Sequence, residues 1–248
     1  MDSYKTPLGE IKVRVFGHAS LHIEWNGKNI YSDPYSEVVD YVGFPAADLV
    51  LVTHNHYDHY DEKALNEILT ENTRLVVASD VPEVDSRYTV LNNYDSFTYE
   101  GINILAVPSY NINRRNEEGN HFHPKGVGNG YILDFNGFKV YIAGDTEPVS
   151  EMDELKDIDI AFLPKNLPYT MTDEEFIALA NRLRPEYLYP IHYFELDEQK
   201  LRERMEIFKE LTKSRKSLVH TFITTYGVAD GIHSSVVHSE VTMESLFE

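Results

Sequence analysis

The sequence predicts an α/β fold made of two related halves, each of them a β-sheet covered by helices. Three observations support this prediction. Short strand-like segments outnumber helical segments, and the helical segments lie between them along the chain. Two strand pairs turn at Asn26-Gly27 and Asn136-Gly137, and Asn-Gly is typical of a tight hairpin. Several landmarks also recur with a nearly constant spacing.

The repeat spans most of each half. Its matched residues are separated by 110 to 112 positions and are Gly27 and Gly137, Asp33 and Asp145, Asp48 and Asp159, Asp61 and Asp173. Each copy is expected to run hairpin, aspartate, strand, loop, helix, strand. A steady offset across four landmarks is harder to produce by chance than one match of β patterning. We therefore predict one domain over residues 1–248, with halves at about 1–100 and 101–220 and a tail at 221–248.

Strands are predicted from alternating polarity and from short apolar runs. Residues 11–35 and 130–147 alternate apolar and polar side chains on both sides of their Asn-Gly turns. Five shorter apolar runs bounded by turn residues are predicted to be buried strands: 47–54, 73–80, 102–110, 157–165 and 186–193.

Three helices are predicted. The first covers residues 60–69. The second, 171–185, begins with a capping box of Thr172 and Glu175. The third, 196–215, is highly charged and carries one apolar face. Since these helices lie between and after the strand segments, we expect them to cover the sheets.

The composition favours a protein that handles a small molecule. With 41 acidic and 22 basic residues, the formal charge is −19, which disfavours binding to nucleic acid or to an anionic membrane. The chain has no cysteine, so disulfides, thiolate metal sites and a cysteine nucleophile are excluded, and His, Asp and Glu remain as candidate ligands.

Neither a membrane span nor a secretory signal is predicted. No stretch approaches 18 consecutive apolar residues, and the first ten residues have no basic and apolar leader pattern. We therefore expect a cytoplasmic protein. The tail alternates in polarity at 234–243, which is compatible with an edge strand or with a subunit contact in a homo-oligomer.

The segment VTHNHYDHYD contains an unusual cluster of potential metal-binding side chains. Three histidines and an aspartate, His54, His56, Asp58 and His59, lie within six residues at the end of a predicted strand. Alternation at a strand end turns His54 and His56 to the same side. Imidazole and carboxylate are the ligands of zinc and its first-row neighbours. A solvated loop leading into a helix is the alternative, but it does not account for the whole cluster.

The segment THNHYDH resembles the H-x-H-x-D-H signature of the metallo-β-lactamase superfamily. The chain is similar to the branch that contains the ascorbate-6-phosphate lactonase-like metal-dependent hydrolases. Further matching segments follow in the family's order to about residue 193: GHASLHIEWNGKNIYSDP, VPSYN, HPKGVGNGYILDFNGFKVYIAGDTE, LPYTMTDEEF and PEYLYPIHY. The resemblance implies a four-layer αββα sandwich of two related halves with a metal pair between them, in agreement with the repeat.

The resemblance also implies which residues bind the ions. One ion is held by His54, His56 and His123, the second by Asp58, His59 and His192, and Asp145 bridges them. His18 and Asp33 are expected to orient the ligands from outside the metal sphere. His121 is the rival of His123, which we prefer because it opens the matching HPKG segment. Zinc is the first expectation, and manganese, iron or nickel would suit the same ligands.

The implied activity is hydrolysis of a small ester, lactone or phosphodiester by hydroxide held on a dinuclear centre, with Asp58 as the catalytic residue that orients it or moves its proton. Residues expected to contact the substrate are Tyr110, Asn111, Arg114, Arg115, Lys125, Lys165 and Tyr169. The basic ones could instead belong to a solvated charged loop. Alternatives are a phosphodiesterase acting on nucleotides or phospholipid head groups, an iron-binding redox protein and a metal-binding regulatory protein without catalysis.

Overall fold

The computed structural model describes residues 1–192, 221–224 and 239–242. Contacts divide the chain into two units, Met1–Tyr193 and Phe194–Glu248, which are described separately. In the second unit β14 (Thr221–Thr224) pairs in parallel with β15 (Ser239–Thr242). The predicted helix at 196–215 lies outside the described residues, and the single domain over 1–248 stays a prediction.

The first sheet of the larger unit has seven strands in the order of the sequence. They are β1 (Asp2–Thr6), β2 (Gly9–Gly17), β3 (Ser20–Trp25), β4 (Lys28–Ser32), β5 (Leu49–Val52), β6 (Arg74–Ala78) and β7 (Tyr88–Leu91). The first four run antiparallel to their neighbours, whereas β4 to β7 pair in parallel.

The second sheet has six strands in the order β13-β12-β11-β10-β9-β8. They are β8 (Ser96–Tyr99), β9 (Ile102–Ser109), β10 (Gly128–Asp134), β11 (Lys139–Ile142), β12 (Ile160–Pro164) and β13 (Tyr187–Ile191). The pairing again changes from antiparallel to parallel, here at β11. Each sheet therefore repeats the same sequence of strand directions.

Both predicted hairpins form. β3 and β4 turn at Asn26 and Gly27, with φ values of 48° and 76°, and β10 and β11 turn at Asn136 and Gly137, with φ values of 60° and 102°. Positive φ at both central residues matches the twist of the flanking strands, and Asn-Gly adopts it at low cost. After each hairpin the chain continues through a parallel strand, a helix and another parallel strand, as the repeat predicted.

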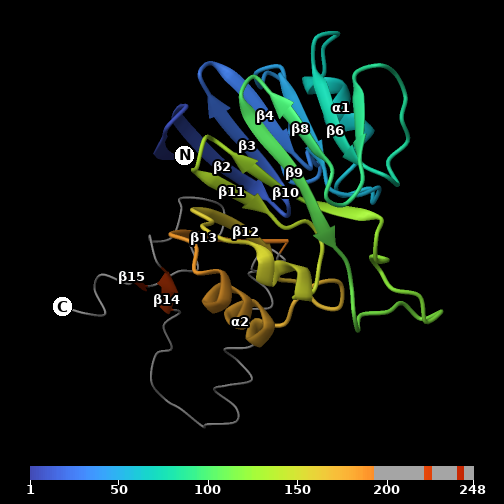
Figure 1. Ribbon diagram of the computed structural model, residues 1–248, viewed down its shortest axis with the longest axis vertical. Helices are drawn as coiled ribbons and strands as arrows, with labels where there is room; N and C mark the ends of the chain where they lie inside the picture. Colours follow the sequence, from blue (N-terminus) through green and yellow to red (C-terminus); the bar gives the residue numbers. More distant parts are fainter. Residues whose placement is uncertain (193–220, 225–238, 243–248) are drawn as a thin grey trace. The chain divides into compact units, whose positions relative to one another are not determined.

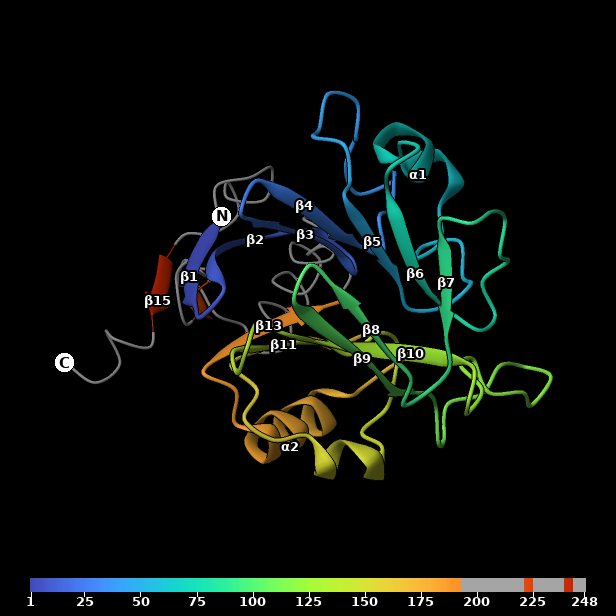
Figure 2. The same cartoon turned by 45° about the horizontal axis from the view of Figure 1, so that its top comes forward.

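The two sheets pack face to face and each carries a helix on its outer face (Figures 1 and 2). Alternate side chains of β5 lie on opposite faces of the first sheet. Leu49 and Leu51 lie in the core between the sheets, while Val50 and Val52 pack beneath α1 (Glu62–Ile68). In the second sheet the outer residues of β12 pack with residues of α2 (Asp173–Leu183). The predicted four-layer αββα sandwich is therefore confirmed.

The helix predictions at 60–69 and 171–185 are confirmed with shorter bounds. Asp61 caps α1, and at α2 both hydrogen bonds of the Thr172–Glu175 capping box are present. The sequence reading missed β1, β7, β8 and the short 3-10 helix η1 (Ser150–Glu154). These are short elements, and β1, β7 and β8 lie at sheet edges, where one side of a strand has no neighbour to impose a strong pattern.

In the described ranges, no helix combines the length and apolar character that a bilayer span needs.

Phe162 should be a sensitive test of the packing between the sheets. Its side chain is fully buried in the central core and stacks on Tyr189 at a ring-centre distance of 4.9 Å. Phe162→Ala is expected to lower the free energy of unfolding by about 3–5 kcal/mol, because it removes buried area and leaves a cavity. Urea denaturation measures the loss, and Phe162→Leu should cost clearly less. Equal losses in both variants would contradict this packing.

Candidate metal centre

The candidate ligands lie at one end of the two sheets because parallel strands place their carboxyl ends together. His54 follows β5, Asp145 follows β11 and His192 follows β13. His18, Asp33 and His192 have positive φ values of 50°, 44° and 53°. This conformation is unfavourable for residues other than glycine, and clusters of it mark sites where side-chain placement outweighs local strain.

The approach of Asp145 depends on the glycine before it. Gly144 has a φ of 63°, and a Cβ atom there would lie 2.9 Å from the backbone oxygen of Asn129 and 3.1 Å from Cβ of Thr53. Only glycine fits this close approach between the two halves without displacing backbone. The turn thereby brings Asp145 next to the histidines of the first half.

Asp33 is completely buried and organises the histidines of the first half. Its carboxylate accepts hydrogen bonds from the backbone nitrogen and hydroxyl of Thr53, both at 2.8 Å, and from Nδ1 of His59 at 2.9 Å. Because the Thr53 hydroxyl donates to Asp33, it accepts from Nδ1 of His54 at 3.0 Å. These bonds leave Nε2 of both His54 and His59 as the nitrogens that face the other candidate ligands.

The first group of ligand atoms belongs to His54, His56 and His123, which lie within 4.8 Å of one another. Nε2 of His54 is 3.0 Å from Nδ1 of His56. Asn111 holds His123, since its Oδ1 accepts from the backbone nitrogen at 2.7 Å and from Nδ1 at 2.9 Å. The Asn111 amide nitrogen donates to the Tyr169 carbonyl, which supports this orientation of the amide.

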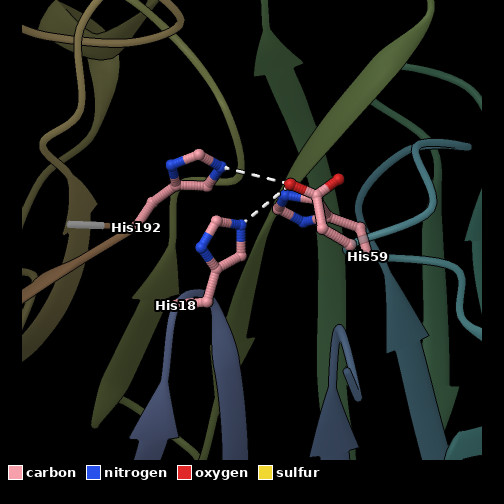
Figure 3. Close-up of side chains that lie close together, drawn as sticks. His18, His59 and His192 are labelled. Carbon is pink, nitrogen blue, oxygen red and sulfur yellow. Dashed lines mark hydrogen bonds and ion pairs between the residues drawn. The ribbon is translucent and has the colours of Figure 1, made fainter. Parts of the chain in front are cut away.

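The second group contains His18, Asp58, His59 and His192, again within 4.8 Å. The rings of the three histidines converge, and dashed lines join His18 and His192 to one carboxylate oxygen (Figure 3). This oxygen is Oδ2 of Asp58, at 2.9 Å from Nε2 of His18 and 3.8 Å from Nε2 of His192. The backbone nitrogen of His192 donates to the His18 carbonyl at 2.7 Å, so the two halves are joined directly at the site.

Asp145 lies between the two groups. Its Oδ2 is 3.3 Å from Nε2 of His123 and 2.8 Å from Nε2 of His192, and its Oδ1 is 3.5 Å from Nε2 of His59. Two ligands at about 2.0–2.2 Å from one tetrahedral ion are separated by about 3.3 Å. The spacing around Asp145 fits ligand atoms of a shared ion, and in the structure the same atoms form ion pairs.

A second observation indicates that these residues fit a metal centre. Nε2 of His59, His123 and His192 and Oδ1 of Asp145 are buried and make no hydrogen bond of acceptable geometry; they meet in the ion-pair contacts around Asp145. Buried polar atoms are almost always paired with a partner, because an unpaired one costs about 1–3 kcal/mol. Four such atoms aimed at the same space suit nitrogen and oxygen ligands of divalent transition metals.

The electrostatics of the histidines also suit metal binding. Burial lowers the pKa of His54 well below its ordinary value and lowers that of His56, so both are neutral ligands at pH 7. Burial disfavours a charge on His59, but the carboxylates of Asp145 and Asp33 outweigh it and raise its pKa well above the ordinary value. In the metal-free protein a proton therefore occupies the ligand position of His59.

Asp58 is ionised across the physiological range. Burial opposes the charge, but the hydrogen bond from His18 and the positive charge at His59 outweigh it, lowering the pKa of Asp58 to about 2. His18 itself is kept largely neutral because burial lowers its pKa. Asp58 is thus a carboxylate ready to bind a cation or to accept a hydrogen bond from a water molecule.

Most loop residues predicted to contact substrate form ion pairs or hydrogen bonds within the protein. Arg114 pairs with Glu147 and Glu175, Lys125 with Glu151, and Lys165 with Asp173. Arg115 donates to the carbonyl of Gly119, the Tyr110 hydroxyl bonds to Glu151, and Asn111 is buried behind His123. His121 bonds through Nδ1 to the carbonyl of Arg114 and belongs to neither ligand group. Tyr169 is partly exposed.

The sequence reading missed Asp80, which lies beside the first ligand group. A cavity of about 20 Å³, enough for one water molecule, is lined by His54, His56, Asp80, Ser109, Phe122, His123, Pro124, Val127, Gly128 and Asp145. Asp80 follows β6, which lies next to β5, the strand that His54 follows, and its Oδ2 accepts from the backbone nitrogen of Asn55 at 3.1 Å. The sequence could have indicated Asp80, because it follows a parallel strand as His54 does.

Comparison with known proteins identifies the family. Residues 12–192 match the model of the β-lactamase superfamily domain, which covers most of the chain. The chain belongs to the metallo-β-lactamase superfamily. A UPF0173 metal-dependent hydrolase from Thermococcus onnurineus is 30% identical over 207 residues, covering 74% of this chain and 84% of that protein. The chain is accordingly a metal-dependent hydrolase of this superfamily, whereas its place in the lactonase-like branch stays a prediction.

Solved structures agree with this membership. A candidate metal-dependent hydrolase from Parabacteroides distasonis is 40% identical, with a TM-score of 0.70 over 83% of this chain and 93% of that chain. A metallo hydrolase from Ignicoccus hospitalis is 24% identical, with a TM-score of 0.60 over 80% of this chain and 91% of that chain. The second likeness bears on the fold alone.

Asn111→Ala should weaken metal binding without unfolding the protein. The substitution removes the acceptor that holds Nδ1 of His123, and loss of such a partner typically costs about 10–100-fold in metal affinity. Competition with a chromophoric chelator measures the change. Asn103→Ala, at an exposed position of β9, is the control and should bind like the wild type. Unchanged affinity in Asn111→Ala would contradict the role of this contact.

Metal binding should release close to one proton from His59 at neutral pH. Its raised pKa means that the metal-free side chain is protonated above pH 6.5, and an ion must displace that proton, whereas His54 and His56 are already neutral. The apparent affinity should therefore rise with pH, by about tenfold per unit for one released proton. Calorimetry in buffers of different ionisation enthalpy counts the protons. Binding at pH 7 without proton release would contradict the assignment.

Proposed function

We propose that the protein hydrolyses a small ester, lactone or phosphodiester at a dinuclear metal centre. His54, His56 and His123 would hold one ion, Asp58, His59 and His192 the second, and Asp145 both. When bound, the ions supply an activated water at neutral pH and stabilise negative charge that develops on the substrate. Zinc is the expected metal, and manganese, iron and nickel suit the same ligands.

A single observation carries the proposal of two ions. The carboxylate of Asp145 lies within 3.5 Å of Nε2 atoms from both ligand groups: His123 in the first, His59 and His192 in the second. One ion would leave one of these groups without a partner in a buried site, which is costly for polar atoms. A carboxylate shared by two ions accounts for both groups at once.

The chain's own residues orient the reacting atoms. Asp58 is ionised and its carboxylate faces the second group, so it can accept a hydrogen bond from the attacking water and orient it. The hydrogen bond from Nε2 of His18 holds this carboxylate in place. Asn111 and Asp33 fix the rings of His123 and His59, so that their ligand nitrogens are aimed before any ion or substrate arrives.

Elemental analysis together with a hydrolase panel tests the proposal. The purified and reconstituted protein is expected to hold about two equivalents of transition metal and to hydrolyse at least one generic ester, lactone or phosphodiester. Metal content near zero after reconstitution would overturn the assignment. A coloured protein rich in iron and without hydrolytic turnover would favour the redox alternative.

Asp58→Asn should abolish turnover while the fold is retained. The amide binds a cation less well than the carboxylate and holds the attacking water less strongly, so kcat is expected to fall by at least about 100-fold. Turnover and circular dichroism are measured on the same preparation. Asp95→Asn, at an exposed position in the turn after β7, is the matched control and should keep full activity. Full activity in Asp58→Asn would refute the proposed mechanism.

A further inference from the structure

Two pairs of aromatic side chains border the metal centre, one beside each ligand group. The ring of Tyr35 lies 5.7 Å from that of His18, and Tyr57 meets Tyr35 edge to face at 6.0 Å. On the other side, Phe122 lines the cavity of the first group and contacts Tyr169 at 4.9 Å. Rings therefore extend from both ligand groups toward solvent.

Tyr57 is unusual because it is 77% exposed although it lies in sequence between two candidate ligands, His56 and Asp58. A large exposed ring contributes little to the stability of the fold, because its apolar surface is not removed from water by the rest of the chain. Exposed aromatic surface at a polar site is typical of ligand binding. A cavity of about 420 Å³ runs along the pair, lined by Tyr35, Ser36, Glu37, Tyr57, Asp61 and Lys63.

The charges around the centre disfavour an anionic substrate. The cavity beside Tyr35 and Tyr57 is lined by the carboxylates of Glu37 and Asp61 and the ammonium of Lys63. Asp80 adds a carboxylate to the smaller cavity beside His54. Oδ1 of Asp80 is buried there without a hydrogen-bond partner. The basic side chains of the nearby loops, Arg114, Lys125 and Lys165, already pair with carboxylates. Positive charge for a phosphate or carboxylate would therefore come mainly from the ions, with the Lys63 ammonium beside Tyr57 and the guanidinium of Arg115, which donates to a carbonyl, as the remaining cations.

We propose that the pairs Tyr35–Tyr57 and Phe122–Tyr169 are the walls of the substrate site and select an uncharged carboxylic ester or lactone that carries an apolar ring. This rests on the hydrolase function proposed above and narrows its substrate class. Water adds across the acyl C–O bond, which breaks to give a carboxylic acid and an alcohol or phenol, with no change of oxidation state. The ring of the substrate packs against Tyr57 while its carbonyl faces the metal centre.

Two lactones with the same six-membered ring separate ring recognition from chemistry. Dihydrocoumarin carries a fused benzene ring and δ-valerolactone does not. Since their intrinsic reactivities differ, the informative quantity is the ratio of their kcat/KM values, compared between wild type and variants. In Tyr57→Ala the preference for dihydrocoumarin should fall roughly 3- to 10-fold, the usual size of an aromatic contact. Tyr94→Ala, at a tyrosine that is 62% exposed and lines neither cavity, should keep the wild-type ratio.

Direct binding gives a readout that does not depend on turnover. Chroman has both rings of dihydrocoumarin but no carbonyl, and saturation-transfer NMR should detect its binding to metal-free wild-type protein and a weaker signal with Tyr57→Ala. Metal content is measured for every variant, so that a loss of ions is not mistaken for a loss of substrate contact.

The outcomes separate this inference from the function on which it rests. An unchanged lactone preference in Tyr57→Ala would overturn it. A higher kcat/KM for bis(4-nitrophenyl) phosphate than for dihydrocoumarin, with two ions bound, would also overturn it while the hydrolase function stands. Metal content near zero would refute the dinuclear hydrolase, and chroman binding would still decide whether Tyr57 recognises an apolar ring.

Discussion

The buried carboxylate of Asp33 is the constraint on which the metal centre depends. A fully buried charge is tolerated only when donors surround it, and here Thr53 and His59 supply three. These bonds join the end of β4 to the loop after β5 and, through the Thr53 hydroxyl, also set the ring of His54. One carboxylate therefore determines the direction of two candidate ligands before a metal is present.

The two halves have the same scaffold but different chemistry. Asp33 and Asp145 occupy matching places after the hairpins, yet the first supports a ligand from behind and the second faces the ligands directly. His192 matches Asp80, and His54 matches Asn166, each at the offset of 112 positions. The amide of Asn166 lies 3.3 Å from Nδ1 of His192. A duplicated pair of sheets thus provides equivalent strand ends, and side-chain identity decides which of them bind metal.

The loop between β9 and β10 is ordered by carboxylates that lie outside it. Buried Glu147 accepts from the backbone nitrogens of Ile112, Asn113 and Arg114 at 2.7 to 3.0 Å and also pairs with the Arg114 guanidinium. Arg114 reaches Glu175, which is also part of the capping box of α2. Arg114 therefore stabilises the loop beside His123.

The sequence by itself determined the features that depend on local pattern. Alternation and Asn-Gly turns predicted the hairpins, the Thr172–Glu175 box predicted α2, and the spacing of His54, His56, Asp58 and His59 indicated a metal site at a strand end. Only the tertiary structure decided what the remaining loop residues do. Arg114 meets carboxylates 33 and 61 positions away, and Asn111 meets a histidine 12 positions on. Such contacts are made by folding of the whole chain, because no local period of polarity specifies which distant carboxylate will neutralise a given cation.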